Sequence, residues 1–328
     1  MKPTVRPSAS AESLQPATPR SRFRRVFLGG DGLRAGWAAL SFAVLFAAVA
    51  AGLVFASHRL MPMPGDPGFS IAGAALMECV QVAAVLIATW GVARFERRSP
   101  RFYGLLGEAR VRRFGWGALA GIVAISALVL VQVQAGWIRL DAPSADVGQA
   151  LVHGLQWAFI FSMTGLFEEM LLRGYLQYTL ARGLGFWWAA LLLSVLFGAL
   201  HGFSPGETPV GLAVAMLFGL LFCLSLWYTG SLWWAIGFHA AWDWGESFVY
   251  GAADSGRMIE GVLFTSHPLG YPLLSGGAAG PEGSVLVLAL LGICALVMWR
   301  WWRTRVPRPP FGTRDWLAPP AGPGKSSA

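Results

Sequence analysis

The segment LQWAFIFSMTGLFEEMLLRGYL, residues 155–176, combines a membrane-like run of apolar side chains with three charged residues. Glu168, Glu169 and Arg173 lie in a stretch apolar enough to enter a bilayer. A charged side chain at that depth costs roughly 2.5–3.5 kcal/mol and usually marks a buried pair or a functional path. The segment therefore predicts a transmembrane helix that carries a polar site.

The remaining sequence also has the composition of a membrane protein. Of the 328 residues, 55% are hydrophobic and only 13% are charged, which excludes an ordinary soluble domain. A transmembrane helix needs about 20 mostly apolar residues. Eight segments meet or approach this length: 35–57, 69–93, 114–135, 147–172, 186–200, 210–228, 231–250 and 284–302. We expect an all-α, polytopic membrane protein of about eight transmembrane helices around an intramembrane polar cavity.

The composition changes along the chain predict six regions. Tails rich in Pro, Ser and Arg or in Pro and Gly are expected to be disordered, and a Gly/Pro-rich stretch is expected to form an extracytoplasmic loop. In order, the regions are a basic tail (1–30), N-terminal helices (31–145), a catalytic helical core (146–250), the loop (251–283), the last helix (284–303) and a C-terminal tail (304–328).

Arginines gather in the N-terminal tail, after the second apolar segment and at the C-terminus. Because cytoplasmic loops are enriched in Lys and Arg, both termini are expected in the cytoplasm. The abundance of Ala, Gly and Arg suggests a bacterial cytoplasmic (inner) membrane. The formal net charge of +8 follows from these clusters. We interpret them as contacts for anionic lipids, and we expect no nucleic-acid partner.

Helical spacing predicts which charged groups pair. Glu169 and Arg173 lie four residues apart, so they share a helix face and can form a salt bridge. Glu168 lies about 100° around the helix from Glu169, so it is free to point elsewhere. The alternative is that all three residues form one structural charge network.

Two histidine motifs follow on later segments. His201 ends the fifth segment in FGALH, and it either serves the site or simply bonds a carbonyl at the membrane interface. His239 and Asp243, in HAAWD, share one face of the seventh segment. An aspartate one turn after a histidine can orient the imidazole and raise its basicity, as carboxylates do for metal-bound histidines. A self-contained His–Asp pair is the alternative.

Together these side chains contain the groups needed to activate a water molecule. Either Glu168 with a histidine acts as a general base, or histidines and acids bind a metal that lowers the pKa of the water. HExxH does not occur in the chain, so the soluble zinc-protease pattern is absent. The polar residues leave both chemistries open.

The ordered motifs EExxxR (168–173), FxxxH (197–201) and HxxxD (239–243) resemble the CPBP family. This family includes CAAX prenyl endopeptidases of the Ras-converting type, bacteriocin-processing enzymes and their immunity relatives. The resemblance covers roughly residues 150–245 and implies an intramembrane endopeptidase that acts on a membrane-associated protein or peptide. It also implies that Glu168 activates the hydrolytic water with His201.

The resemblance gives His239 and Asp243 one of two roles. They stabilise the oxyanion, or with His201 and Glu168 they bind one divalent metal, for which zinc is the first expectation. Many relatives have Asn at position 243. An ionised Asp243 cannot donate a hydrogen bond to an oxyanion but can accept one or bind a metal, so this difference favours the metal.

Two other functions fit the same residues. An inactive relative would bind a membrane partner as an immunity or scaffold protein, and a transporter would use the polar groups as a proton relay. Transporters often have paired halves with interrupted helices, and the sequence shows no such pairing. Retention of every acid and base favours the enzyme.

Four further polar residues are expected to be structural. Glu78 is predicted to be a hydrogen-bonded structural acid that could reach the cavity, and Glu246 to lie at the membrane interface. His267 and Glu282 are predicted to decorate the 251–283 loop, with a substrate contact as the alternative.

The depth of the predicted site residues presents a difficulty. His201 lies about 15 residues, or ~22 Å of helix, from the cytoplasmic start of its segment, whereas Glu168 stands near the predicted end of the fourth. The fifth segment must therefore tilt, break or start deep in the membrane.

Overall fold

A computed structural model describes residues 26–29, 32–60, 70–106, 109–143 and 146–304. Within these residues, five helices are long and apolar enough to cross a membrane: α2 (Ala35–Leu60), α3 (Ile71–Phe95), α4 (Arg110–Gln134), the kinked helix Val147–Leu184 and α8 (Pro209–Thr229). Shorter apolar helices are α7 (Phe186–His201) and α11 (Leu286–Trp302). The short helix α9 (Trp233–Asp243) continues as a π-helical stretch, η3 (Trp244–Val249). The predicted all-α polytopic membrane fold is confirmed, and each of the eight predicted segments contains a helix.

The chain divides into two compact units, Met1–Arg34 and Ala35–Ala328. In the first, β1 (Leu28–Gly29) pairs antiparallel with β2 (Gly32–Leu33). The second unit carries the helices. The tails predicted at 1–30 and 304–328 lie almost wholly outside the described residues.

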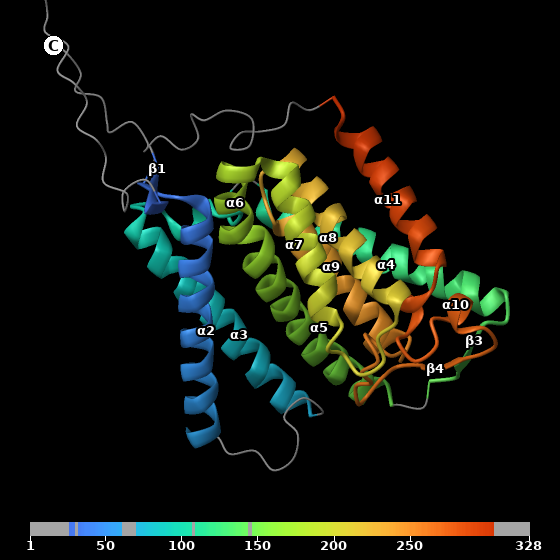
Figure 1. The fold of residues 1–328 in the computed structure, drawn as a ribbon. Helices are drawn as coiled ribbons and strands as arrows, with labels where there is room; N and C mark the ends of the chain where they lie inside the picture. Colours follow the sequence, from blue (N-terminus) through green and yellow to red (C-terminus); the bar gives the residue numbers. More distant parts are fainter. Residues whose placement is uncertain (1–25, 30–31, 61–69, 107–108, 144–145, 305–328) are drawn as a thin grey trace, which may run out of the picture. The chain divides into compact units, whose positions relative to one another are not determined.

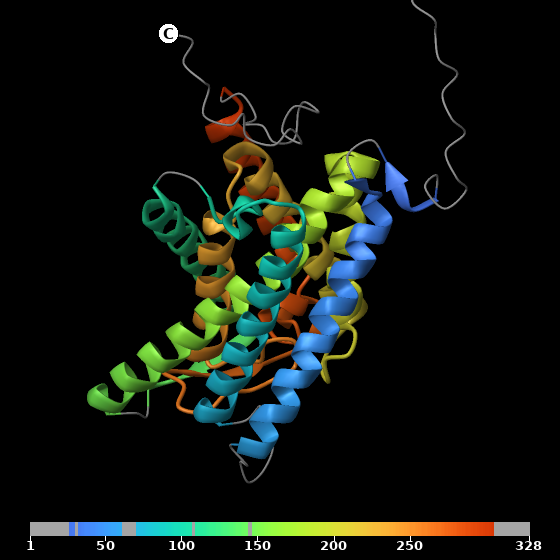
Figure 2. The same cartoon turned by 90° about the vertical axis from the view of Figure 1, so that its left-hand side faces the viewer.

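The helices of the second unit pack against neighbours both close and distant in sequence. Figure 1 shows α5 beside α9 and α7 beside α8, and Figure 2 shows α2 beside α3. One buried apolar cluster joins α4, α8, α9 and α11. A second joins α2 and α3 to the kinked helix and to α8. Helices that carry the polar residues are thus supported by apolar packing.

The fourth transmembrane segment is longer than the sequence predicts. α5 (Val147–Glu169) passes directly into a π-helical stretch, η2 (Met170–Leu176), and then into α6 (Gln177–Leu184). The kink lies at Gly174, where φ −80° and ψ −123° are not helical. The predicted end at residue 172 is therefore wrong, because the charged side chains before it are paired inside the protein and do not mark a helix end.

This extension removes the depth difficulty. Gly185, with φ +84°, forms the turn between α6 and α7, which pack side by side. Glu168 lies 17 residues before Gly185 and His201 lies 16 residues after it, or roughly 25 Å of helix in each case. The two side chains therefore reach the same depth on opposite arms of a helical hairpin.

Close backbone contact holds α9 against α4. A Cβ at Gly117 or Gly121 of α4 would overlap a backbone carbonyl of α9, and a Cβ at Gly237 of α9 would overlap a carbonyl of α4. Small residues permit this approach between membrane helices. Because α9 carries His239 and Asp243, the glycine contact positions both side chains.

The connections contain short regular elements. The 3₁₀ turn η1 (Pro100–Phe102) lies between α3 and α4. In the loop predicted at 251–283, β4 (Thr265–Pro268) pairs antiparallel with β3 (Ile138–Asp141). The same loop contains α10 (Pro272–Ser275) and the 3₁₀ turn η4 (Pro281–Gly283). This loop is more ordered than its Gly/Pro content predicts.

Candidate active site

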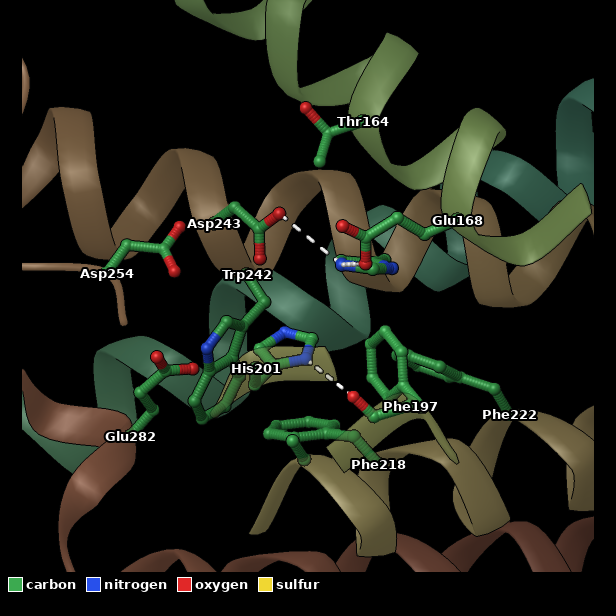
Figure 3. A pocket seen from close by; sticks show the side chains of 12 residues that line it. Thr164, Glu168, Phe197, His201, Phe218, Phe222, Trp242, Asp243, Asp254 and Glu282 are labelled. Carbon is green, nitrogen blue, oxygen red and sulfur yellow. Dashed lines mark hydrogen bonds and ion pairs between the residues drawn. The ribbon is translucent and has the colours of Figure 1, made fainter. Parts of the chain in front are cut away.

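A cavity lies between α5, α7, α8 and α9, with part of the 251–283 loop as a further wall (Figure 3). The polar residues that line it are Thr164, Glu168, His201, His239, Asp243, Asp254 and Glu282, and the aromatic ones are Phe197, Phe218, Phe222 and Trp242. The four residues predicted to be catalytic therefore lie together, although they come from three separate helices.

Glu169 and Arg173 form the pair that their spacing predicts. Arg173 Nη1 donates to Glu169 Oε1 at 3.1 Å, and neither side chain is exposed. The guanidinium also lies 4.3 Å from the centre of the Phe197 ring, a cation–π contact. This pair anchors α5 where it passes into η2.

Both ring nitrogens of His239 face carboxylates. Nδ1 lies 3.2 Å from Glu169 Oε1, and Nε2 lies 3.6 Å from Glu168 Oε2 and 3.5 Å from Asp243 Oδ2. An imidazole donates from both nitrogens only when it is protonated. The arrangement therefore suits a positively charged ring. Helical spacing predicted the contact with Asp243 but not the contact with Glu169.

Glu168 is the carboxylate that remains available for chemistry. Its side chain is 26% exposed, whereas that of Glu169 is fully buried. Among the described residues, Glu168 Oε2 has no hydrogen-bond partner, although it is buried. Figure 3 shows the carboxylate at the cavity. A buried oxygen without a partner is costly in a structural network, so this geometry favours a role in binding or activating a molecule in the cavity.

His201 makes the carbonyl contact expected of an interfacial histidine and also lines the cavity. Its Nδ1 lies 2.9 Å from the Phe197 carbonyl oxygen. Because a carbonyl only accepts, Nδ1 carries the hydrogen of the neutral ring and Nε2 carries the free lone pair. The ring packs edge-on against Phe197, with centroids 4.5 Å apart. His201 thus has a basic nitrogen available for a water molecule.

Residues 148–245 match the family model described as type II CAAX prenyl endopeptidase, Rce1-like. The matched range runs from the start of α5 to just beyond α9 and contains all three sequence motifs. The match covers 98 of the 328 residues, and over this segment the chain is similar to intramembrane CAAX-type proteases of the CPBP family. No curated protein and no solved structure was found to match the chain.

Three acids at or near the cavity were not predicted as site residues. Asp254 and Glu282 belong to the 251–283 loop, yet both line the cavity. Burial raises the pKa of both carboxyl groups, that of Glu282 to about 8. Glu246 was predicted to lie at the membrane interface, but it is fully buried. Its side chain accepts hydrogen bonds from Trp242 Nε1 at 2.8 Å and from the backbone N–H of Glu282 at 3.1 Å. Of the three, only Glu282 lies in a recognisable sequence feature, the Gly-rich stretch GAAGPEGS at residues 277–284. Apolar periodicity cannot predict where such a stretch lies in the fold.

Two other residues, Glu78 and His267, are predicted to be structural. Glu78 lies on α3, and its Oε2 is buried without a hydrogen-bond partner among the described residues. His267 Nε2 lies 2.8 Å from Asp141 Oδ2 on an exposed surface. Its role as loop decoration fits this position, whereas Glu282 belongs to the cavity wall.

The residues expected to hold zinc, Glu168, His201, His239 and Asp243, all line the cavity. Among the described residues, no group of three or more His, Cys, Asp or Glu side chains is placed to hold a metal ion. His239 Nδ1 contacts Glu169 and His201 Nδ1 contacts a backbone carbonyl, which are the contacts that metal-bound histidines make through their second ring nitrogen. The mechanism proposed below uses only the side chains of the protein, and the metal stays a separate expectation.

Proposed function

We propose that the chain is an intramembrane endopeptidase that hydrolyses a peptide bond in a membrane-associated protein or peptide. The observation that carries this proposal is the position of Glu168, whose Oε2 makes no hydrogen bond to the described residues and lies at a polar cavity lined also by His201 and His239. The match of residues 148–245 to a protease family supports it. A purely structural network has no need of this second, partly exposed acid.

Glu168 acts as the general base. It takes a proton from a water molecule while His201 Nε2 accepts the other hydrogen of that water and orients it. The water oxygen forms a bond to the carbonyl carbon of the substrate. Glu168 then gives its proton to the departing amine as the C–N bond breaks, which restores the carboxylate.

His239 stabilises the negative charge that develops on the substrate oxygen. Its ring lies between Glu169 and Asp243, and these carboxylates favour the protonated form. A positively charged N–H donor in a site shielded from water is an effective partner for an oxyanion. Asp243 Oδ2 lies 3.5 Å from Nε2, so its charge favours the protonated ring while the Nε2–H is left to donate to the oxyanion.

The membrane orientation follows from the arginines. Arginines cluster near the C-terminal end of α3 and near the end of α11, and Figure 1 shows α6 and the end of α11 on the side opposite to β3, β4 and α10. We infer that the arginine-rich side faces the cytoplasm of a bacterial cell and contacts anionic lipids. Cysteine-accessibility labelling of Arg303→Cys from each side of the membrane tests this orientation.

A cleavage assay tests the proposed function. The purified full chain in detergent is incubated separately with two internally quenched peptides. The first has a farnesylated CaaX end, because the matched family is named for CAAX prenyl endopeptidases. The second is an apolar peptide without the lipid. Wild type is expected to cleave at least one peptide. Glu168→Gln is expected to fold with an unchanged thermal midpoint but to lose activity by on the order of 100-fold or more, because the base is lost. Equal cleavage by wild type and Glu168→Gln would refute the assignment.

A further inference from the structure

The 251–283 loop brings two carboxylates into the cavity that the proposed mechanism does not use. Asp254 and Glu282 line the same space as Glu168 and His201. Figure 3 shows both carboxylates on one side of the cavity, towards His201 and Asp243. The loop therefore forms a wall of the site.

A strained turn carries Asp254. The backbone N–H of Asp254 donates to the Arg257 carbonyl at 2.9 Å, and the N–H of Arg257 donates back at 2.8 Å. Between them, Ser255 has φ +47°, a left-handed conformation that a residue with a side chain rarely adopts. Such strain persists only where the surrounding structure fixes it.

Glu282 fixes this turn. Its Oε1 accepts from the backbone N–H of Ser255 at 2.7 Å and from the Ser255 hydroxyl at 2.8 Å. The N–H of Glu282 donates to Glu246 Oε1, and Glu246 Oε2 accepts from Trp242, the neighbour of Asp243 in α9. The turn is thus linked by hydrogen bonds to the helix that carries the site.

The same turn is packed against the segment that follows His201. A Cβ at Gly206 would overlap the Gly256 backbone, and a Cβ at Gly256 would overlap Gly206. Two backbones in direct contact leave little room for movement. Burial raises the pKa of Asp254, whereas the charges of His201 and, to a smaller extent, His239 act in the opposite direction and favour its ionised form. Hydrogen bonds therefore connect this turn to α9, whereas backbone packing and charge connect it to His201 and the segment that follows it.

We propose that Asp254 is a positioning residue that acts through His201, by presenting a negative charge to its ring, and that Glu282 is the clamp that keeps Asp254 in place. This inference rests on the proposed function, because it assigns a role within the same hydrolysis. It extends the site from the three helices to a loop outside the family match, which ends at residue 245.

The first test compares Asp254→Asn with Asp141→Asn, a matched control that removes an exposed carboxylate on β3. The probe is the farnesylated quenched peptide. For Asp254→Asn, kcat is expected to fall by on the order of 10- to 100-fold while KM and the thermal midpoint stay within the range of the control. An unchanged kcat would overturn the proposal. A fall in the thermal midpoint beyond that of the control would also overturn it, in favour of a structural role.

The second test addresses the clamp. Glu282→Gln retains an oxygen that can accept from Ser255 and is expected to retain most of kcat, whereas Glu282→Leu is expected to lose as much as Asp254→Asn. Ser255→Gly relieves the positive φ, so it is expected to recover part of the loss in the Glu282→Leu background. Equal activity of the Gln and Leu variants would overturn the clamp.

Failure of this inference can be distinguished from failure of the proposed function. If Glu168→Gln is inactive and Asp254→Asn behaves like Asp141→Asn, only the role of Asp254 is wrong. If Glu168→Gln cleaves the peptide as wild type does, the proposed function itself is wrong, and the inference falls with it.

Discussion

Glu169 Oε1 accepts from Arg173 Nη1 at 3.1 Å and lies 3.2 Å from His239 Nδ1, so one buried oxygen connects the structural pair to the imidazole of the site. The sequence motif EExxxR therefore combines two functions. Its second acid balances a buried arginine and orients a histidine, while its first acid faces the cavity. Loss of the contact with Arg173 should mainly affect stability, whereas loss of the orientation of His239 should mainly affect activity.

Arg173→Ala is expected to destabilise the protein strongly. It leaves Glu169 without its cation in a site that is not exposed, and breaking a buried pair from one side typically costs about 3–5 kcal/mol. Expression and the thermal midpoint in detergent should fall together, and Glu169→Gln in the same chain should recover part of the loss. The control is Arg139→Ala, which breaks an exposed pair and should leave the thermal midpoint almost unchanged. A double variant no more stable than the worse single variant would argue against the pairing.

Asp243→Asn is expected to lower activity by about 10- to 100-fold, the usual cost of removing a carboxylate that orients an imidazole. An amide presents one acceptor and one donor group, so it supports a protonated His239 less well than a carboxylate. The thermal midpoint should change little. Full activity of Asp243→Asn would instead indicate that residue 243 donates to the oxyanion.

Dialysis of the wild-type protein against a chelator separately tests the hypothesis that a bound metal ion activates the water. Because the mechanism proposed here uses Glu168 as the base, activity is expected to remain after the treatment. Metal analysis of the same samples provides the control. Stoichiometric zinc, together with loss of activity that added zinc restores, would replace the glutamate mechanism by a metal-dependent one.

Gly121→Ala is expected to reduce both stability and activity. Its Cβ would overlap the Phe238 carbonyl, next to His239, and neither backbone can move without separating α4 from α9. Overpacking of this kind typically costs about 1–3 kcal/mol. Gly115→Ala on the same helix is the matched control, because nothing lies within 4 Å of its Cβ. Thermal unfolding of the two variants checks the prediction, and equal midpoints would contradict it.

The pH dependence of stability should contain a contribution from Glu282. Burial raises its pKa from 4.5 to about 8, so the folded state binds this proton more tightly than the unfolded state does. The resulting stabilisation is fully present below pH 4.5 and is lost as the pH rises to about 8. Glu282→Gln should flatten that part of the curve of thermal midpoint against pH. A variant curve parallel to that of wild type would show that Glu282 does not titrate in this range.

Local patterns in the sequence were enough to predict much of the structure. Apolar segments predicted all eight helical regions, because the cost of burying a polar backbone in lipid acts on each segment separately. Spacing of four residues predicted the Glu169–Arg173 salt bridge and the shared face of His239 and Asp243, because both depend only on helical geometry. The family resemblance supplied the proposed chemistry of Glu168 and His201.

Only the tertiary structure decided the features that depend on contacts between distant segments. The extension of the fourth segment to Leu184 sets Glu168 at the depth of His201, and the glycine contact between α4 and α9 sets the position of His239. Asp254 and Glu282 enter the cavity because Ser255 and Glu246 hold their loop there. Hydropathy and helical periodicity describe one segment at a time, so they predict which side chains a helix presents on one face. Which segments those side chains meet is determined by packing over the whole chain.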